Sequence, residues 1–130
     1  RALLPWKTVG KNIVFQFPGF STRSMLRSLG ELGLNSCISS MYPYELSLGM
    51  YKRVELFLAV LAKPKILLLD EFYSSIGDDQ KNDVRRFLAE HRKEHVTWVV
   101  AHEEKLRDWI AGPQFAFVMS GQTVTGIRRI

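Results

Sequence analysis

The sequence predicts an α/β fold in which helices surround a parallel sheet and a helical portion comes first. One observation is the run Ile66–Leu69, apolar at every position, which leads directly into Asp70 and Glu71. The other is the largely apolar run 97–101, which indicates a second buried strand, follows a helical pattern and ends in His102. Continuous apolar runs are typical of parallel strands covered on both faces. Helices followed by strand, helix and strand indicate the α/β class.

Length and composition favour one ordinary globular domain. The 130 residues suffice for a real core, and the hydrophobic share of 46% and charged share of 24% are average. The net charge of +5 is spread over scattered cations, so neither nucleic-acid nor membrane-surface binding is indicated. The single Cys37 excludes an internal disulfide and fits a reducing compartment. The longest apolar stretch, Leu56–Ala62, is far too short to span a bilayer.

Two helices are expected before residue 34. Thr8 can cap a short helix through about Phe15, and Ser21 or Thr22 can cap a second that stops near Gly33. The expected apolar positions are Val9, Ile13 and Val14 in the first helix and Met25, Leu26, Leu29 and Leu32 in the second.

Two longer helices are expected on either side of the first strand. After a polar loop over 35–45, Ser47 should open a helix that ends before Pro64, and Asp78 or Asp79 should cap the next. Their expected core positions are Met50, Val54, Phe57, Leu58, Leu61, Val84, Phe87 and Leu88. A short helix over 103–110 and a hairpin formed by 115–119 and 123–127 complete the chain.

Three polar side chains follow the two strands. Ligands of open α/β sheets bind at the carboxyl ends of the strands, where Asp70, Glu71 and His102 are expected. In that order they can supply a metal ligand, a base that orients water, and a donor to a transferred phosphoryl group. The alternative is that His102 caps the next helix and the acids are solvated. That alternative is favoured for His102 taken alone, but less so beside the acid pair.

The segment Ser47-Leu48-Gly49 is a second candidate site. At a helix start it offers free backbone N–H groups and the positive end of the helix dipole, which together attract anions. The plainer alternative, a helix cap by Ser47, is favoured when the segment is considered alone. The sequence has no Gly-rich loop ending in Lys-Ser or Lys-Thr, so it cannot hold a triphosphate by the usual P-loop.

Four segments together resemble the second half of the nucleotide-binding domain of ABC transporters. Residues 42–54, Tyr-Pro-Tyr-Glu-Leu-Ser-Leu-Gly-Met-Tyr-Lys-Arg-Val, resemble the signature segment, usually YPxxLSGGMxQRV. Residues 63–71 resemble the Walker B strand with its catalytic glutamate, 74–77 the D-loop, and 99–103 the switch-histidine strand. The resemblance runs through the chain in the right order and implies a P-loop NTPase-like fold.

The start of the chain carries a further resemblance. Residues 3–9 with Asn12 resemble the stretch after the Q-loop in nitrate, sulfonate and taurine importer ATPases. The resemblance implies a partial domain, with a helical and signature region over about 1–62 and a Walker B to switch-histidine core with the hairpin over about 63–130. The A-loop aromatic, Walker A and the Q-loop glutamine would all precede Arg1, and the sequence does not begin with Met. We therefore expect a truncated or split domain that by itself neither binds ATP tightly nor hydrolyses it.

The resemblance implies ATP and Mg²⁺ as cofactors. Asp70 would hold the magnesium shell, Glu71 would orient or deprotonate water, and His102 would contact the γ-phosphate. Ser47 and Gly49, with Leu48 between them in the signature, would reach ATP bound to the opposite subunit.

The D-loop counterparts are Gly77 and Asp78. The implied partners are a second nucleotide-binding domain and a transmembrane permease, at the cytoplasmic face of the plasma membrane, with no nucleic acid.

The chain departs from the family pattern at several positions. Leu48 replaces the first signature glycine, where a side chain would block contact with phosphate or strain the backbone. Lys52 replaces the usual glutamine, and Phe72 replaces the proline after the acid pair. Gly77 replaces the D-loop aspartate, although Asp78 is one residue further on.

Three hypotheses follow. The first is the ATP-hydrolysing subunit of an importer, present as an incomplete domain. The second is a degenerate, non-catalytic partner domain, which Leu48 and Gly77 favour. The third, a basic nucleic-acid-binding module, rests on charge alone. The transported substrate is not encoded in these residues.

Overall fold

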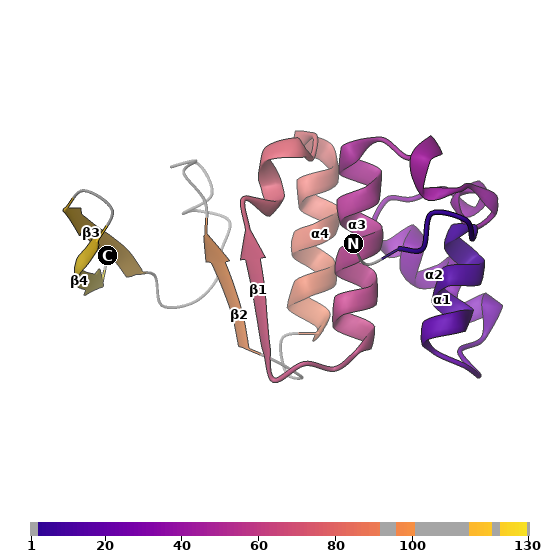
Figure 1. Cartoon of the computed structure of the whole chain (residues 1–130), viewed down its shortest axis with the longest axis horizontal. Coiled ribbons are helices and arrows are strands. Elements are labelled where there is room, and N and C mark those ends of the chain that lie inside the picture. Colours follow the sequence, from indigo (N-terminus) through magenta and orange to yellow (C-terminus); the bar gives the residue numbers. More distant parts are fainter. Residues whose placement is uncertain (1–2, 92–95, 101–114, 121–122, 130) are drawn as a thin grey trace.

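The computed structural model describes residues 3–91, 96–100, 115–120 and 123–129. Figure 1 labels the helices and strands of these ranges. The helices are α1 (Val9–Gln16), α2 (Thr22–Glu31), α3 (Leu48–Leu61) and α4 (Asp78–His91), with 3₁₀ turns η1 (Ser36–Ser40), η2 (Pro43–Glu45) and η3 (Phe72–Ser75). The strands are β1 (Ile66–Asp70), β2 (Val96–Val100), β3 (Phe115–Ser120) and β4 (Thr123–Arg129).

Helix α1 begins as predicted but buries a different face. The Thr8 hydroxyl accepts a hydrogen bond from the Lys11 amide at 3.4 Å, which confirms the cap. Val9 and Ile13 are buried, but Val14 is 45% exposed, so its expected place in the core is wrong. The polar Asn12 is fully buried beside Ile13, because it bonds the chain that enters the helix.

Asn12 ties the entry segment to α1 through four hydrogen bonds. Its Oδ1 accepts from the Leu4 amide at 2.7 Å. Its Nδ2 donates to the carbonyl oxygens of Leu4, Lys7 and Thr8 at 3.1, 2.9 and 3.0 Å. A buried amide is tolerated when its hydrogen-bonding groups are satisfied, and here each of them is.

The α2 helix and the segment after it are confirmed in part. The Ser21 hydroxyl caps α2 by accepting from the Ser24 amide at 3.1 Å, and Gly33 follows the helix at a φ of 67°. The prediction of a polar loop over 35–45 is wrong. This segment contains the 3₁₀ turns η1 and η2, and its Ile38 is completely buried.

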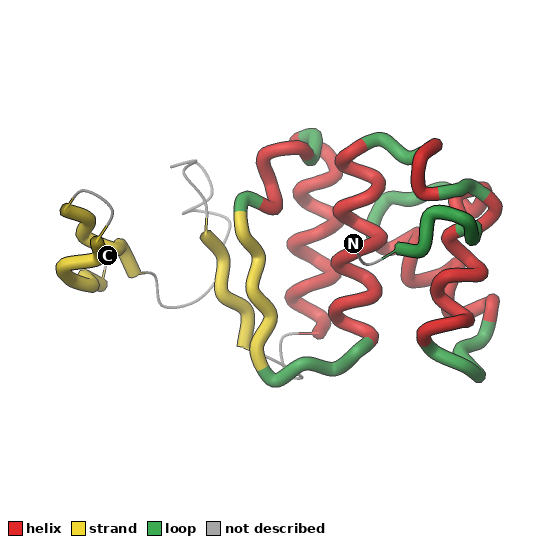
Figure 2. The backbone as a smooth tube through the Cα atoms, viewed as in Figure 1, coloured by secondary structure: helices red, strands yellow, loops and turns green. Residues whose placement is uncertain are grey.

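The parallel pairing of β1 and β2 is confirmed. Ile66 lies opposite Val96, and Asp70 lies opposite Val100. The expectation that β1 is covered on both faces is wrong: Leu67 and Leu69 are buried, but Ile66 and Leu68 are 60% and 70% exposed. In Figures 1 and 2, α3 and α4 cover one face of the strand pair, and no element of the described ranges covers the other.

Helix α4 follows η3, and β3 and β4 form a separate hairpin. Both Asp78 and Asp79 lie within the first turn of α4, so neither is its cap; the Gly77 carbonyl accepts the Lys81 amide at 3.0 Å and starts the helix. The β3–β4 hairpin is confirmed as antiparallel, with an irregularity at Val118 and Met119. The helix expected over 103–110 lies outside the described residues. Within the described ranges, no helix combines the length and apolar character needed to cross a membrane.

The helices pack in two layers beside the strand pair. Figure 1 shows α3 and α4 next to β1, with α1 and α2 beyond them. One hydrophobic cluster runs through these layers, from Leu3 and Ile13 to Leu69 and Phe87. The turn η3 joins this cluster through Phe72 and Tyr73, whose rings meet edge to face at 5.4 Å. Burial raises the pKa of Tyr73 to about 12.

Replacing Asn12 with Ala should lower the free energy of unfolding by roughly 2 kcal/mol or more, because buried backbone groups around it lose their partner. Urea denaturation of the purified chain measures the difference. Asn82→Ala, on an exposed position of α4, is the matched control and should change stability by less than about 0.5 kcal/mol. Equal effects of the two substitutions would contradict this role for Asn12.

The buried Tyr73 should make stability fall at alkaline pH. A tyrosine pKa near 10 in the unfolded chain and about 12 in the folded chain stabilises the fold fully below pH 10. This contribution, on the order of 2–3 kcal/mol, is lost as the pH rises from about 10 to about 12. Urea denaturation at several pH values should show a shallower decline for Tyr73→Phe. The exposed Tyr44→Phe should keep the wild-type decline, and identical profiles for all three chains would refute the prediction.

Candidate functional site

The start of α3 has the form expected of an anion-binding helix end. The Ser47 hydroxyl accepts from the Met50 amide at 3.2 Å, which confirms the predicted cap. Leu48 and Gly49 are the first two residues of the helix, and no acceptor for their backbone N–H groups appears in the described part of the chain. Such unsatisfied N–H groups, at the positive end of the helix dipole, are suited to bind a phosphate.

Gly49 brings this helix end against η3. A Cβ atom at Gly49 would lie 2.6 Å from the carbonyl oxygen of Ser75, closer than side chains are found in proteins. The first turn of α3 therefore packs backbone to backbone on the turn that follows the acid pair. The structure thus places the start of α3 against η3, which directly follows Asp70 and Glu71, whereas the sequence indicated the helix start and the acid pair separately.

Leu48 is placed without strain. It is helical, and the only non-glycine residues with a positive φ in the described ranges are Lys63 and Glu71. The expected backbone strain at Leu48 is therefore wrong. Its side chain is 64% exposed at the tip of the helix, so obstruction of an approaching phosphate stays a prediction.

The two carboxylates differ in their surroundings. Asp70 is the exposed last residue of β1, and Glu71 is half-buried. Glu71 has a left-handed backbone, with φ 46° and ψ 30°. Its carbonyl oxygen accepts hydrogen bonds from Lys52 Nζ at 2.7 Å and from the Ser74 hydroxyl at 2.8 Å.

Lys52 is a site residue that sequence reasoning recognised only as a departure from the family pattern. It lies three residues after Gly49, so both residues are on the face of α3 that meets η3. Its ammonium also reaches the carbonyl oxygen of Phe72, at 3.4 Å. The spacing from Gly49 places Lys52 on this face of the helix, but only the structure shows that the carbonyl oxygen of Glu71 lies within its reach.

The D-loop candidates lie at the start of α4. Gly77 is exposed, and a Cβ there would collide with the Gln80 side-chain oxygen. Asp78 forms an ion pair with Lys81 at 3.0 Å. His102 lies outside the described residues, two positions after Val100, the partner of Asp70 in the sheet.

The acid pair fits the part of a magnesium site that a protein usually supplies. Mg²⁺ is commonly held by one or two carboxylates together with water and substrate phosphates. Asp70 is exposed at the strand end with Glu71 next to it, while the described residues contain no group of three or more His, Cys, Asp or Glu side chains that could form a full ligand cage.

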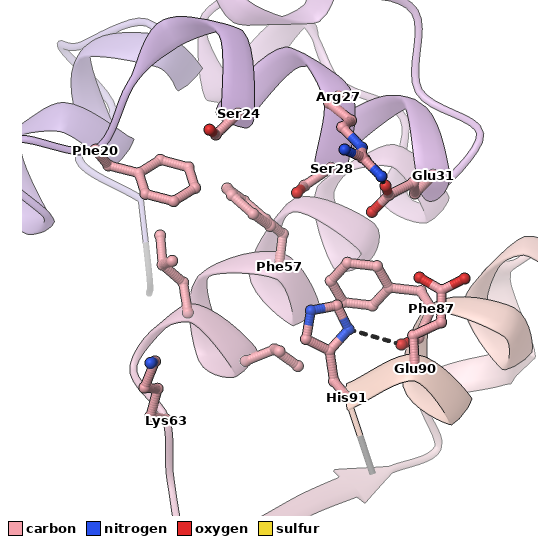
Figure 3. Close-up of a pocket in the computed structure, with 12 residues that line it drawn as sticks. Phe20, Ser24, Arg27, Ser28, Glu31, Phe57, Lys63, Phe87, Glu90 and His91 are labelled. Atoms are coloured by element: carbon pink, nitrogen blue, oxygen red, sulfur yellow. Dashed lines mark hydrogen bonds and ion pairs between the residues drawn. The ribbon is translucent and has the colours of Figure 1, made fainter. Parts of the chain in front are cut away.

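A separate hollow of about 440 Å³ lies between α2, α3 and α4. Figure 3 shows its aromatic lining, with Phe20, Phe57 and Phe87, and the Arg27–Glu31 pair at its rim. His91 packs against Phe87 at a centroid distance of 4.4 Å. This hollow reaches the carboxyl end of α3, about 20 Å from Ser47 at the usual helical rise, so it does not belong to the site.

Comparisons with known proteins agree with this arrangement. A family model described as ABC transporter matches residues 1–74. The sulfate/thiosulfate import ATP-binding protein CysA of Synechococcus elongatus is 33% identical over 111 residues, covering 80% of this chain and 32% of the relative. The Fe(3+) ions import ATP-binding protein FbpC of Pseudomonas fluorescens is 31% identical over 108 residues, covering 79% of this chain and 31% of the relative.

Solved structures support the fold. The dimeric ATP-binding cassette MJ0796 bound to ADP and Pi is similar with a TM-score of 0.72 at 19% identity, covering 98% of this chain and 58% of that one. The putative cobalt transport ATP-binding protein ST1066 is similar with a TM-score of 0.66 at 26% identity, covering 83% and 41%. The predicted α/β fold of the ABC ATPase type is thereby confirmed.

The chain spans about a third of the length of the curated relatives named above. The family match covers more than half of the residues of this chain and includes the start of α3 and the acid pair. The chain therefore belongs to the ABC transporter family.

Proposed function

We propose that this chain is part of the ATP-binding, ATP-hydrolysing subunit of an ABC importer, which couples ATP hydrolysis to transmembrane transport. The observation that carries the proposal is the direct packing of the first turn of α3 on η3, the turn that directly follows Asp70 and Glu71. The names of the two relatives, both import ATP-binding proteins, support an importer.

The acid pair would act on ATP held by a P-loop segment. Bound Mg²⁺ would neutralise charge on the phosphates. Asp70 would supply the carboxylate to the metal, and its exposure at the end of β1 leaves room for phosphate and water. Glu71 would orient the attacking water or take its proton, and His102 would contact the γ-phosphate.

The start of α3 would act on a second nucleotide-binding domain. The Ser47 hydroxyl and the N–H groups of Leu48 and Gly49 would meet the γ-phosphate of ATP bound to that domain. Gly77 and Asp78, at the D-loop position, would lie at the same interface. The dimeric form of the MJ0796 cassette agrees with such an arrangement.

The other partner would be a transmembrane permease, with this subunit on the cytoplasmic face of the membrane. The stretch Leu3–Val9 favours the nitrate, sulfonate and taurine subtype. The two named relatives instead import sulfate/thiosulfate and Fe(3+) ions. Copurification with candidate permeases would distinguish these subtypes.

A non-catalytic partner domain is the second candidate. Leu48 stands exposed where the family usually has glycine, and Gly77 stands where it usually has aspartate. Such a domain would present the start of α3 to the ATP bound by a partner domain, or would bind a permease, without hydrolysing ATP itself.

The catalytic proposal is tested in a fusion that joins the P-loop segment of the CysA relative ahead of Arg1. The fusion should hydrolyse ATP in a magnesium-dependent way, whereas the 130-residue chain alone should not. Glu71→Gln should lower kcat by roughly 10²–10⁴-fold while ATP binding is retained, because the water loses its general base. A phosphate-release assay measures both.

Glu90→Gln, at an exposed position of α4, is the matched control for this assay and should keep full activity. An active fusion whose rate of ATP hydrolysis is unchanged by Glu71→Gln would refute the catalytic role of Glu71. A folded fusion without turnover would support the non-catalytic partner domain.

The role of the α3 start is tested at Leu48. Leu48→Gly should tighten the ATP-dependent association of the chain with an intact ABC ATPase subunit by about tenfold, since a good phosphate hydrogen bond is worth about 1.4 kcal/mol or more. Leu48→Ala keeps a Cβ atom and should gain less. Analytical ultracentrifugation with and without ATP measures the association, and equal affinities for all three chains would refute the obstruction.

A further inference from the structure

The backbone of Glu71 needs an explanation of its own. A left-handed conformation is disfavoured for residues with a Cβ atom and persists only where the surroundings hold it. Lys63, the other described non-glycine residue with a positive φ, follows the end of α3, where left-handed caps are common. Glu71 follows a strand instead, and it carries the carboxylate of the site.

Two side chains hold the carbonyl group of Glu71. The Ser74 hydroxyl, at 2.8 Å, is a local partner three residues further on. Lys52 Nζ, at 2.7 Å, comes from α3, nineteen residues earlier in the chain. The hydrogen bond from Lys52 has a charged donor, and such bonds are stronger and shorter than those between neutral groups. The distance of 2.7 Å agrees with this. The same ammonium lies 3.4 Å from the carbonyl oxygen of Phe72, so it spans the turn.

We propose that Lys52 is a positioning residue for the Glu71 carboxylate. By holding the carbonyl group of Glu71, the ammonium sets the peptide plane and with it the direction of the Glu71 side chain. The inference rests on the proposed function, in which Glu71 orients the attacking water.

This arrangement couples the two halves of the site. Lys52 lies one turn after Gly49, whose backbone packs on Ser75. A displacement of the start of α3 therefore moves the peptide that orients Glu71. The start of α3, which would meet ATP on a second domain, thus also influences the orientation of the Glu71 carboxylate in its own chain.

Three substitutions separate this role from general stabilisation. Lys52→Met keeps an unbranched apolar stem but removes the ammonium group and with it every donor. Lys52→Gln keeps an uncharged amide donor group on a shorter side chain. Lys65→Met removes an exposed lysine that precedes β1 and is the matched control.

The first measurement uses the 130-residue chain labelled with ¹³C and ¹⁵N. Lys52→Met should shift the Cα and Cβ resonances of Glu71 away from left-handed values, Lys52→Gln should restore them in part, and Lys65→Met should leave them unchanged. Unchanged Glu71 resonances in a folded Lys52→Met chain would overturn the proposal. If Lys52→Met does not fold, Lys52→Gln decides, because the loss of the charged donor must still shift Glu71 partway.

The second measurement is kinetic and uses the fusion with the P-loop segment. Lys52→Met should lower kcat by about 10–100-fold, since misplacement by about 1 Å costs up to that much, and should leave KM for ATP within about twofold. Lys52→Gln should recover most of the rate. A fusion that is active but insensitive to Lys52→Met refutes the positioning role and leaves the proposed function standing. A wild-type fusion without turnover refutes the proposed function, and the resonances of Glu71 still decide the role of Lys52.

Discussion

The buried guanidinium of Arg53 is the interaction on which the arrangement of the site depends. It donates to the carbonyl oxygens of Leu32 and Gly33, at 2.9 and 3.1 Å, and to that of Gly49 at 3.1 Å. Burial lowers its pKa, and the nearby Asp83 carboxylate opposes that shift. One charged group therefore joins the end of α2 and the first turn of α3, with α4 beside them. Removing it would leave several buried polar groups unsatisfied, which is more damaging than losing a surface pair.

This junction explains why the chain is close-packed at Gly33. Gly33 has a φ of 67°, and a Cβ there would collide with the Asp83 carboxylate and approach the Arg53 guanidinium. Through Arg53, the first turn of α3 is held against the end of α2. From that position Gly49 packs on η3 and Lys52 reaches Glu71, so the geometry of the acid pair depends on a contact in the helical region.

Features set by neighbouring residues could be predicted from the sequence. The caps at Thr8, Ser21 and Ser47 use side chains that bond an amide three residues away, and β1 with β2 and the terminal hairpin show plain local patterns. Features set by distant residues could not. The exposed face of β1 and the burial of Asn12 depend on what packs against each element. The left-handed backbone of Glu71 likewise depends on a lysine in α3, nineteen residues earlier in the chain. Within the candidate site, the residue types were therefore predictable, but the contact that orients them was not.

Positions 48 and 49, at the start of α3, are subject to different physical constraints. Gly49 is required by the fold itself, because Ser75 occupies the space where its Cβ would lie. A glycine there consequently says nothing about catalysis. Leu48 is largely exposed in relaxed helical geometry, so packing among the described residues does not require glycine at that position. In the proposed function, a phosphate approaching from a second domain would favour glycine at 48, since backbone N–H groups at a helix start bind anions through close contact. In the proposed function, position 48 would therefore report on nucleotide binding between domains, whereas the glycine at position 49 reflects packing within one.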